Sequence, residues 1–249
     1  MAKRLPLIGL KREQRILEEA LSRRKSLVLL GRPGSGKTAL LEWVCQLPAR
    51  WKTLVYVPRF NTPHGLLLTI AQELIRCGHA PFQRLASAGV EWERRLERQT
   101  SSRLKGLLWL AFEQEPAAIL LDHLNSPGHT VYRFLQRLYF TPGMALVGAA
   151  RDQRHLGELR RLFWDPRQIL CVEPLSEREA LRLFDAAADY FGLNGLELED
   201  FRQKVLDSAG GNPGEIVEMC RLASGTRYRS GKHIQFSLIR IELKMAQLE

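Results

Sequence analysis

The chain has 249 residues, of which 45% are hydrophobic and 26% are charged, a balance that is typical of folded globular proteins and excludes wholesale disorder. No apolar run approaches the roughly 18 residues of a membrane-spanning helix, and the N-terminal sequence lacks the apolar core of a signal peptide. We therefore expect a cytoplasmic protein with no membrane span.

The charge of the chain is positive and unevenly distributed. The formal net charge is +10; residues 1–25 hold eight Lys or Arg against three acidic residues, and residues 221–232 hold four against none. Such segments attract nucleic acid or an acidic partner, although no regular aromatic pattern interleaves with them. The cysteines are scattered without metal-ligand spacing, and we expect them to be reduced and mostly buried: Cys45, Cys77, Cys171 and Cys220.

Strand-length apolar runs alternate with helical patterns over residues 1–173. The runs are apolar almost throughout, which favours strands buried on both faces of a parallel sheet. The alternation predicts a three-layer α/β domain with a five-stranded parallel sheet and right-handed crossovers. In chain order the patterns predict strands at 26–30 and 53–57, helices at 62–78 and 91–114, a strand at 117–121, a helix at 131–140, and strands at 145–150 and 168–173.

Helical patterns without strands follow from residue 174. The first has a capping box formed by Ser176 and Glu179, and three helices together predict a small all-α lid domain over residues 174–224. The remaining residues, 225–249, form a basic tail. Part of the tail alternates like a strand and also fits an amphipathic helix, so both structures remain open for it. The predicted lid helices span residues 174–192, 198–209 and 213–223.

The stretch "GRPGSGKT" lies between the first predicted strand and a helical run. It fits the pattern Gly-x-x-x-x-Gly-Lys-[Ser/Thr] in full, in the context that makes this pattern specific for a phosphate-binding loop. Its glycines allow backbone N–H groups to converge on phosphate oxygens, and the helix adds its positive end. Lys37 is suited to the β- and γ-phosphates and Thr38 to Mg²⁺. The predicted nucleotide-binding residues are Gly31, Arg32, Pro33, Gly34, Ser35, Gly36, Lys37 and Thr38.

The stretch "AILLDHLN" supplies the second half of the predicted site. An aspartate at the carboxyl end of a buried parallel strand lies where ligands bind in open α/β sheets. We therefore predict that Asp122 and Thr38 hold the metal, although Asp122 could instead begin a surface turn. His123 follows, where a nucleotide hydrolase usually has a glutamate, and Asn125 lies close enough in sequence to orient a water.

These motifs resemble the P-loop ATPases of the AAA+ class, above all the branch shared by Orc/Cdc6-type initiators and the STAND signalling ATPases. The resemblance rests on five stretches in order: "LIGLKREQRILEEAL", "GRPGSGKT", "AILLD", "ALVGAARD" with "VEPLSEREALRLF", and "SAGGNPGEI". It implies an adenine pocket lined by Ile8 and Gly9, a γ-phosphate-sensing Arg151, and Pro213 against the adenine or ribose. Together with the two motifs above, it predicts a catalytic set of Lys37, Asp122 and Arg151, with His123 at the position of the family's glutamate.

The chain departs from this family at three places. His123 replaces the catalytic glutamate. Gly214 lies near the position of a second sensor arginine, so that contact is absent or passes to Arg221. Too few residues follow the lid for the winged-helix DNA-binding domain of initiators. Arg160 and Arg161 lie where relatives place an arginine finger for a neighbouring subunit, on what we expect to be an amphipathic helix.

The resulting hypothesis is an ATP- and Mg²⁺-binding ATPase that acts as a nucleotide-dependent switch or assembly factor, with slow intrinsic hydrolysis because of His123. Its partners would be a protein or further copies of the chain. Two alternatives remain open: a DNA-associated ATPase subunit of the transposition or replication-loading type, and a scaffold that binds ATP without hydrolysing it. A small-molecule kinase fits the five-strand plan and the helical lid poorly.

Overall fold

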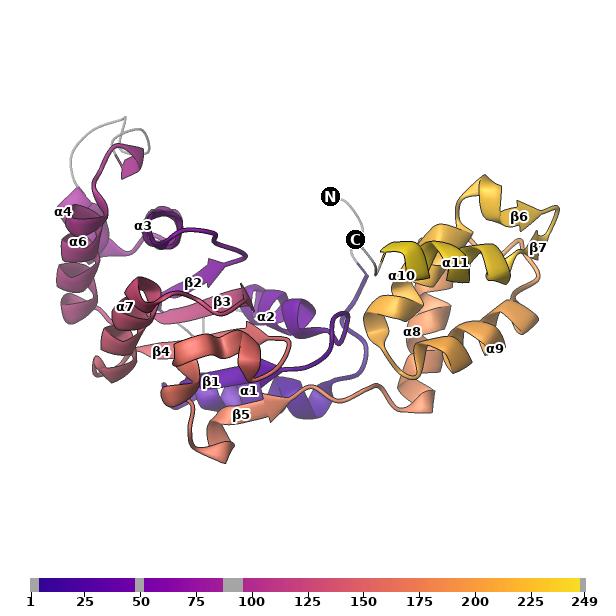
Figure 1. Cartoon of the computed structure of the whole chain (residues 1–249), viewed down its shortest axis with the longest axis horizontal. Helices are drawn as coiled ribbons and strands as arrows, with labels where there is room; N and C mark the ends of the chain where they lie inside the picture. Colours follow the sequence, from indigo (N-terminus) through magenta and orange to yellow (C-terminus); the bar gives the residue numbers. More distant parts are fainter. Residues whose placement is uncertain (1–4, 48–51, 87–95, 247–249) are drawn as a thin grey trace. The chain divides into compact units, whose positions relative to one another are not determined.

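The computed structural model describes residues 5–47, 52–86 and 96–246 (Figure 1). The chain forms two compact units, here called the sheet unit and the helical unit. The middle of the phosphate loop groups with the helical unit, whereas both ends of the loop belong to the sheet unit. The sheet unit comprises Arg12–Arg32 and Lys37–Cys171, and the helical unit comprises Met1–Lys11, Pro33–Gly36 and Val172–Glu249.

The sheet unit contains one parallel sheet with the strand order β2-β3-β4-β1-β5. All five predicted strands are confirmed. β1 lies between β4 and β5, with Val28 in register with both Gly148 and Ile169. β1 and β4 are buried along their whole length, which explains why their sequences are apolar without alternation. The strands are β1 (Leu27–Leu30), β2 (Leu54–Val57), β3 (Ala118–Leu124), β4 (Ala145–Ala150) and β5 (Ile169–Cys171).

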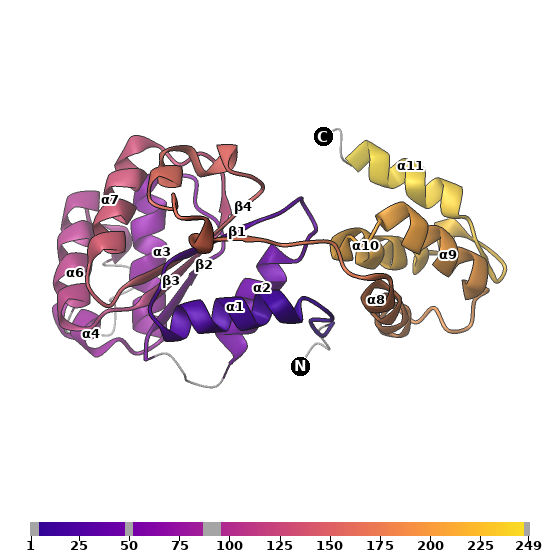
Figure 2. The ribbon, with the colours of Figure 1, turned by 90° about the horizontal axis from the view of Figure 1, so that it is seen from below.

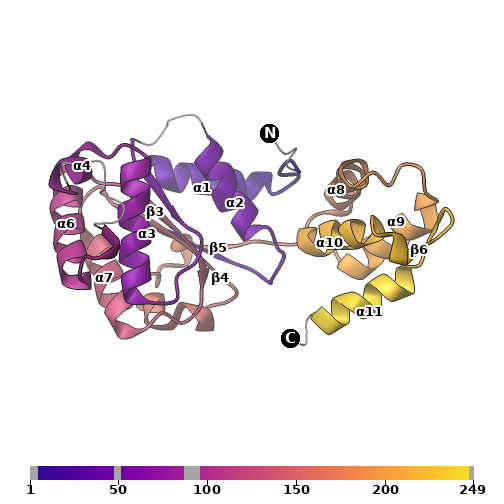
Figure 3. The same ribbon diagram turned by 90° about the horizontal axis from the view of Figure 1, so that it is seen from above.

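Helices cover both faces of this sheet (Figures 2 and 3). One large apolar core joins one face of the sheet to α3, α6 and α7 and to the 3₁₀ segment η1. Leu17 and Leu21 of α1 and Leu40 and Leu41 of α2 are buried outside that core, on the other side of the sheet. The helices are α1 (Lys11–Ser22), α2 (Lys37–Gln46), α3 (Pro63–Arg76), α4 (Ala80–Ala86), α6 (Ser101–Gln114), α7 (His129–Phe140) and η1 (Arg154–Arg161).

The ends of α3 follow from the sequence, whereas the helix predicted at 91–114 is partly wrong. Thr62 caps α3 as predicted, accepting a hydrogen bond from the Gly65 N–H, with Pro63 in the first turn. The described part of 91–114 is not one helix, because Thr100 has an extended backbone and its side chain caps a new helix, α6, by accepting from the Arg103 N–H. Residues 91–95 of that prediction lie outside the described residues.

The helical unit contains the three predicted lid helices, and the tail contains both of its candidate structures. The Glu179 carboxylate accepts a hydrogen bond from the Ser176 N–H, as expected of a capping box, and a second one from the Ser176 hydroxyl. A hairpin of two short antiparallel strands precedes a C-terminal helix. The tail residues that could be strand or helix are therefore strand at their start and helix from Phe236 onward. The elements are α8 (Glu177–Tyr190), α9 (Leu198–Ala209), α10 (Pro213–Ala223), η3 (Thr226–Tyr228), β6 (Arg229–Ser230), β7 (His233–Ile234) and α11 (Phe236–Ala246).

No helix within residues 5–47, 52–86 and 96–246 is long and apolar enough to cross a membrane.

All four cysteines are free, but the prediction that they are mostly buried is wrong. Only Cys220 is buried, because it lies on the inner side of α10, whereas Cys45, Cys77 and Cys171 lie at the ends of their elements or near them, where the core does not cover them.

Candidate nucleotide-binding site

The phosphate loop connects β1 to α2 at the carboxyl edge of the sheet. Gly34 and Gly36 have φ values of +77° and +95°, which a residue with a Cβ atom adopts only with strain. Gly31 lies in the sheet unit and donates its N–H to the Arg151 carbonyl at 3.2 Å, so the loop begins beside the end of β4. The loop therefore contains two backbone conformations that glycine adopts readily and that other residues adopt only with strain.

Lys37 begins α2 and turns back toward the start of the loop. Its Nζ donates to the carbonyl oxygens of Gly31 at 2.7 Å and Arg32 at 2.9 Å. Burial lowers the pKa of Lys37 below its ordinary value, and the nearby Asp122 carboxylate partly opposes this shift. The ammonium group is therefore held by backbone dipoles in a partly dry place, where an anionic phosphate would stabilise its charge more strongly than it would in water.

Asp122 lies near the end of β3 and is 2% exposed, which excludes the surface turn considered for it. Its Oδ1 accepts a hydrogen bond from the His123 N–H at 2.8 Å, and its Oδ2 accepts one from the Tyr56 hydroxyl at 3.2 Å. These bonds orient the carboxylate from two sides. A buried carboxylate is costly unless charges or donors surround it, so these bonds and Lys37 also help to keep it in place.

His123 lies at an irregularity of β3. Leu121 is in register with Gly148, but the next pair is Leu124 with Ala150, so β3 gains one residue over β4 between them. His123 has φ +51°, a conformation in which histidine is more frequent than most residues with a Cβ atom. Its side chain is 49% exposed, with Nε2 3.5 Å from Asp122 Oδ2. The bulge therefore turns the imidazole toward solvent and beside the Asp122 carboxylate.

Tyr56 is a site residue that the sequence reading missed. On β2 it pairs in register with Leu120, two residues before Asp122, so the Tyr56 and Asp122 side chains emerge on the same face of neighbouring strands. Burial, followed by the Asp122 carboxylate, raises the pKa of Tyr56 far above its ordinary value. The phenol thus stays protonated and donates to Asp122. A tyrosine near the end of an apolar strand is only a partial signal, because its role follows from the pairing of β2 with β3.

The Tyr56→Phe variant should weaken the metal-dependent part of nucleotide binding. Losing one hydrogen bond to a carboxylate corresponds to about 1 kcal/mol or more, so we expect affinity in the presence of Mg²⁺ to fall about fivefold and affinity in excess chelator to stay unchanged. Titration with a fluorescent ATP analogue measures both. Tyr132→Phe, which removes a hydroxyl bonded to Gln136, is the matched control and should bind as the wild type does. Equal losses with and without Mg²⁺ would show that Tyr56 does not act through Asp122.

The segment after β4 carries Arg151 and the arginines considered as a finger. Arg151 directly follows β4 and its side chain is exposed, at the edge where the loop begins. Arg160 and Arg161 are exposed in the last turn of η1. The amphipathic helix expected here is wrong: η1 consists of 3₁₀ turns with a kink at Gly157, whose φ of +54° and ψ of −130° interrupt any continuous helix.

The residues that the family resemblance assigns to the base lie in the helical unit together with the loop residues Pro33–Gly36. Gly9 has φ +76°, and a Cβ there would approach the Leu175 side chain to 2.6 Å. The next residue, Leu10, packs against Gly36 so closely that a Cβ on Gly36 would lie 2.7 Å from it. Ile8 is half-buried beside them, and Pro213 is the first residue of α10. Their contact with adenine stays a prediction.

The donor set near the loop suits a small hard cation. Thr38, in the first turn of α2, offers a hydroxyl oxygen, and Asp122 offers a carboxylate whose orientation is fixed by neutral donors. Mg²⁺ prefers a few protein oxygens of this kind together with phosphate and water. Thr38 and Asp122 are therefore the residues that could hold a Mg²⁺ ion beside a bound triphosphate.

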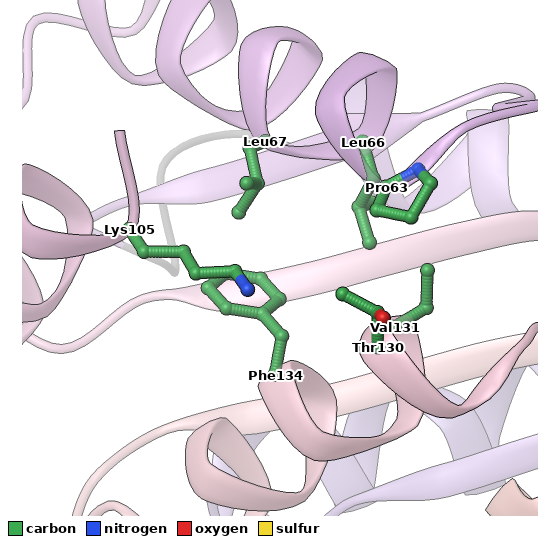
Figure 4. Close-up of a pocket in the computed structure, with 7 residues that line it drawn as sticks. All are labelled: Pro63, Leu66, Leu67, Lys105, Thr130, Val131 and Phe134. Carbon is green, nitrogen blue, oxygen red and sulfur yellow. The ribbon is translucent and has the colours of Figure 1, made fainter. Parts of the chain in front are cut away.

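A separate gap in the sheet unit is too small for a nucleotide. It leaves almost no room even for a water molecule and lies between α3, α6 and α7, where Figure 4 shows Leu66, Leu67 and Phe134 facing one another beside the Lys105 side chain. Ligand pockets usually exceed about 300 Å³, and no phosphate-loop residue lines this one. We interpret it as a packing gap between helices.

The basic segment 221–232 is largely engaged in contacts within the helical unit. Arg221 forms two hydrogen bonds with Glu218, at 2.8 and 2.6 Å. Arg227 pairs with Glu242 at 2.7 Å, and Arg229 donates to the carbonyls of Ala223 and Ser224 at the end of α10. These contacts give three of the four basic side chains a role in the fold itself, and they weaken the argument from charge alone for a nucleic-acid surface.

Comparison with known proteins supports the fold. No protein-family model and no curated protein matches the sequence. A solved Walker-type ATPase of Pyrococcus abyssi superposes with a TM-score of 0.66 at 16% identity, over 99% of this chain and 76% of that one. A STAND protein of Pyrococcus horikoshii with a tetratricopeptide repeat sensor gives a TM-score of 0.53 at 16% identity, over 98% of this chain but only 33% of its own length.

A mutant of RuvB from Thermotoga maritima also superposes, with a TM-score of 0.53 at 14% identity over 98% of this chain and 72% of that chain. Identities this low speak for the fold rather than for the activity. The superpositions extend over nearly all of this chain, and so include its five-stranded parallel sheet and the helices after β5. This chain thus has the fold of the P-loop ATPases of the AAA+ type.

Proposed function

We propose that this chain binds ATP with Mg²⁺ and acts as an ATPase of the AAA+/STAND type, serving as a nucleotide-dependent switch or assembly factor. The observation that carries the proposal is a complete phosphate-loop sequence whose Lys37 lies close to a buried aspartate, Asp122. The two are close enough for the Asp122 carboxylate to oppose the lowering of the Lys37 pKa by burial. The first test is whether the purified chain binds a fluorescent ATP analogue in the presence of Mg²⁺ and releases it to unlabelled ATP. Absence of binding would overturn the proposal.

The residues divide the work of holding a triphosphate. Backbone N–H groups of the loop and the positive end of α2 bind phosphate oxygens, and Lys37 exchanges its carbonyl partners for the β- and γ-phosphates. Thr38 and Asp122 would hold the metal, which would supply positive charge beside the phosphate oxygens. Arg151, exposed directly after β4, is the residue that we propose forms forked hydrogen bonds with the terminal phosphate.

Hydrolysis should be slow because of His123. A water attacking the terminal phosphate is usually oriented by a carboxylate, whereas His123 offers an imidazole that leans toward Asp122 and is half exposed. Asn125, also exposed, can orient a water without taking its proton. Slow turnover suits a switch, since the bound state then lasts long enough to be recognised by a partner.

We expect the His123→Glu variant to hydrolyse ATP faster than the wild type, by about tenfold or more, because a positioned carboxylate base contributes a factor of this order or larger. Steady-state phosphate release at saturating ATP and Mg²⁺ measures the effect. His123→Asn is the matched control: asparagine tolerates the left-handed backbone at this position but cannot accept a proton, so its turnover should not exceed that of the wild type.

Two outcomes would contradict this interpretation of His123. Fast turnover by the isolated wild-type chain would show that the imidazole serves the attacking water well. Equal turnover in His123→Glu and His123→Asn would show that the side chain at this position does not face the water at all. Thermal unfolding of both variants guards against a trivial loss, since glutamate fits the backbone φ of +51° less readily than histidine does.

For the partner, we propose a protein, either a second copy of the chain or another polypeptide, as the target of the switch. The exposed Arg160 and Arg161 are available for contact with a neighbouring subunit's nucleotide, as arginine fingers are. Turnover per molecule that rises with protein concentration is the sign of such assembly. The alternative of a DNA-associated subunit gains no specific support, because Arg221, Arg227 and Arg229 are engaged within the fold.

A further inference from the structure

The first turn of α10 contains a glycine, Gly214, that the backbone conformation of the helix does not require. Gly214 follows Pro213, the first helical residue, and its φ lies outside the left-handed region, so its backbone would accept any side chain. Glycine costs a helix up to about 1 kcal/mol relative to alanine. The reason is a close approach: a Cβ on Gly214 would lie 2.6 Å from the Gly34 Cα, in the phosphate loop.

Two hydrogen bonds accompany this approach. The Gly214 N–H donates to the Gly34 carbonyl at 2.8 Å, and the Asn212 Nδ2 donates to the Pro33 carbonyl at 3.0 Å. Asn212 also caps α10, since its Oδ1 accepts from the Gly214 N–H at 3.1 Å. The contact is tight from the loop side too, because a Cβ on Gly34 would lie 2.6 Å from Asn212 Oδ1. The turn Asn212–Gly214 thus grips the loop backbone without using any charged group.

Holding these carbonyls fixes the direction of the neighbouring N–H groups. In a trans peptide the C=O and N–H bonds point in opposite directions. The Pro33 carbonyl shares its peptide unit with the Gly34 N–H, and the Gly34 carbonyl shares its unit with the Ser35 N–H. With both carbonyls directed at α10, the two N–H groups point away from α10. A phosphate-binding loop needs its N–H groups directed at the phosphates in this way.

We propose that Asn212 and Gly214 are positioning residues for nucleotide: they hold the Pro33 and Gly34 carbonyls so that the Gly34 and Ser35 N–H groups are aimed at the phosphates. The inference rests on the proposed function of the loop as a nucleotide site. The start of α10 thereby contacts the loop through neutral hydrogen-bonding groups. The first turn of α10 carries Gly214 rather than a charged side chain. Phosphate binding and the state of the Asn212–Gly214 turn are then coupled in both directions.

The test uses Asn212→Ser in the full chain. Serine keeps a capping oxygen for α10 but is too short to donate to the Pro33 carbonyl. The variant also loses the bond from Asn212 Nδ2 to Glu215 Oε1 at 3.2 Å, which lies within the first turn of α10. We expect the affinity for an ATP analogue with Mg²⁺ to fall about fivefold, as for the loss of the one hydrogen bond that reaches the loop. In the nucleotide-free protein, the amide NMR resonances of Gly34 and Ser35 should shift, while those of Glu218–Leu222 inside α10 should not, because the helix remains capped.

Two further variants separate a positioning role from a structural one. Asn194→Ser removes a side-chain hydrogen bond of similar kind, from Asn194 to Asp189 in the same unit, and should leave affinity and the Gly34 and Ser35 resonances unchanged. Gly214→Ala places a methyl group against Gly34 and should weaken binding about tenfold or more, given the 2.6 Å approach. Gly106→Ala, in open space on α6, is its control.

The outcomes distinguish this inference from the proposed function. If the wild type binds no nucleotide, the proposed function fails, and the resonances of Gly34 and Ser35 still report whether Asn212 orients the loop. If the wild type binds nucleotide while Asn212→Ser matches it in both affinity and resonances, the positioning role is overturned and the proposed function stands. Added nucleotide should also shift the Gly214 amide resonance in the wild type; an unshifted resonance would refute the coupling.

Discussion

Replacing Lys37 with alanine should lower the affinity for ATP by about 100-fold or more. Lys37 is the only loop side chain with a positive charge in a partly buried position, and two charge-assisted hydrogen bonds to phosphate are together worth about 3 kcal/mol or more. Direct titration of wild type and variant with a fluorescent ATP analogue measures the effect. Binding that survives unchanged would show that the loop does not cradle a triphosphate.

The control for this variant is Lys232→Ala, which removes an exposed lysine from the helical unit and lowers the net charge by the same amount. It should bind as the wild type does, and this separates the specific contact from general attraction between a basic protein and an anion. The fold should survive Lys37→Ala. The variant loses two hydrogen bonds to the Gly31 and Arg32 carbonyls, but it also removes the cost of desolvating the partly buried ammonium group, which is what lowers the pKa of Lys37. An unfolding midpoint close to that of the wild type would confirm this.

The Asp122→Asn variant should lose the contribution of Mg²⁺ to nucleotide binding and nearly all turnover. The amide keeps the shape of the side chain and an oxygen for one of the bonds from Tyr56 and His123, but it removes the charge that attracts the cation. We expect affinity with Mg²⁺ to fall about tenfold or more and affinity in chelator to remain at the wild-type level or above it. Titrations with and without Mg²⁺ give the comparison.

The structure also predicts how Asp122→Asn affects stability without ligand. Asp122 is 2% exposed, and neutralising a buried carboxylate removes its desolvation penalty, so the unfolding midpoint should stay unchanged or rise. Asp207→Asn, on the exposed surface of α9, is the matched control and should leave Mg²⁺ dependence unaltered. A Mg²⁺ effect of wild-type size in Asp122→Asn would assign the metal to another residue.

Periodicity and local capping were enough to predict most elements of this fold. The helices predicted at 198–209 and 213–223 coincide with α9 and α10, because their ends carry strong signals: Gly210 has φ +51° after α9, and Asn212 with Pro213 begins α10. The break before α6 was missed because Thr100 lies within a polar stretch that continues the helical pattern. Only its extended backbone and its side-chain hydrogen bond reveal a cap.

The candidate site likewise contains residues that local sequence patterns predict and residues whose roles depend on distant parts of the chain. The loop and Asp122 could be predicted because each is a local pattern beside a strand. Tyr56 could not, because its role depends on the register between β2 and β3, which sequence does not specify. The Asn212–Gly214 grip depends on contacts between residues about 180 positions apart, as from Asn212 to Pro33. From the sequence, Gly214 marks only a position where related proteins carry an arginine. In the structure, the lack of a side chain at Gly214 allows the close approach to Gly34.

The bulge in β3 affects how this chain should be aligned with structurally similar ATPases. An alignment counts residues one by one, so it pairs His123 with the position after the metal-binding aspartate in any relative. The direction of a side chain depends instead on the alternation of the strand, and that alternation changes phase where β3 gains a residue over β4 after Leu121. Two sequences that match letter for letter here can present different side chains to the same water, so relatives should be grouped by whether they carry the bulge before their residues at this position are compared.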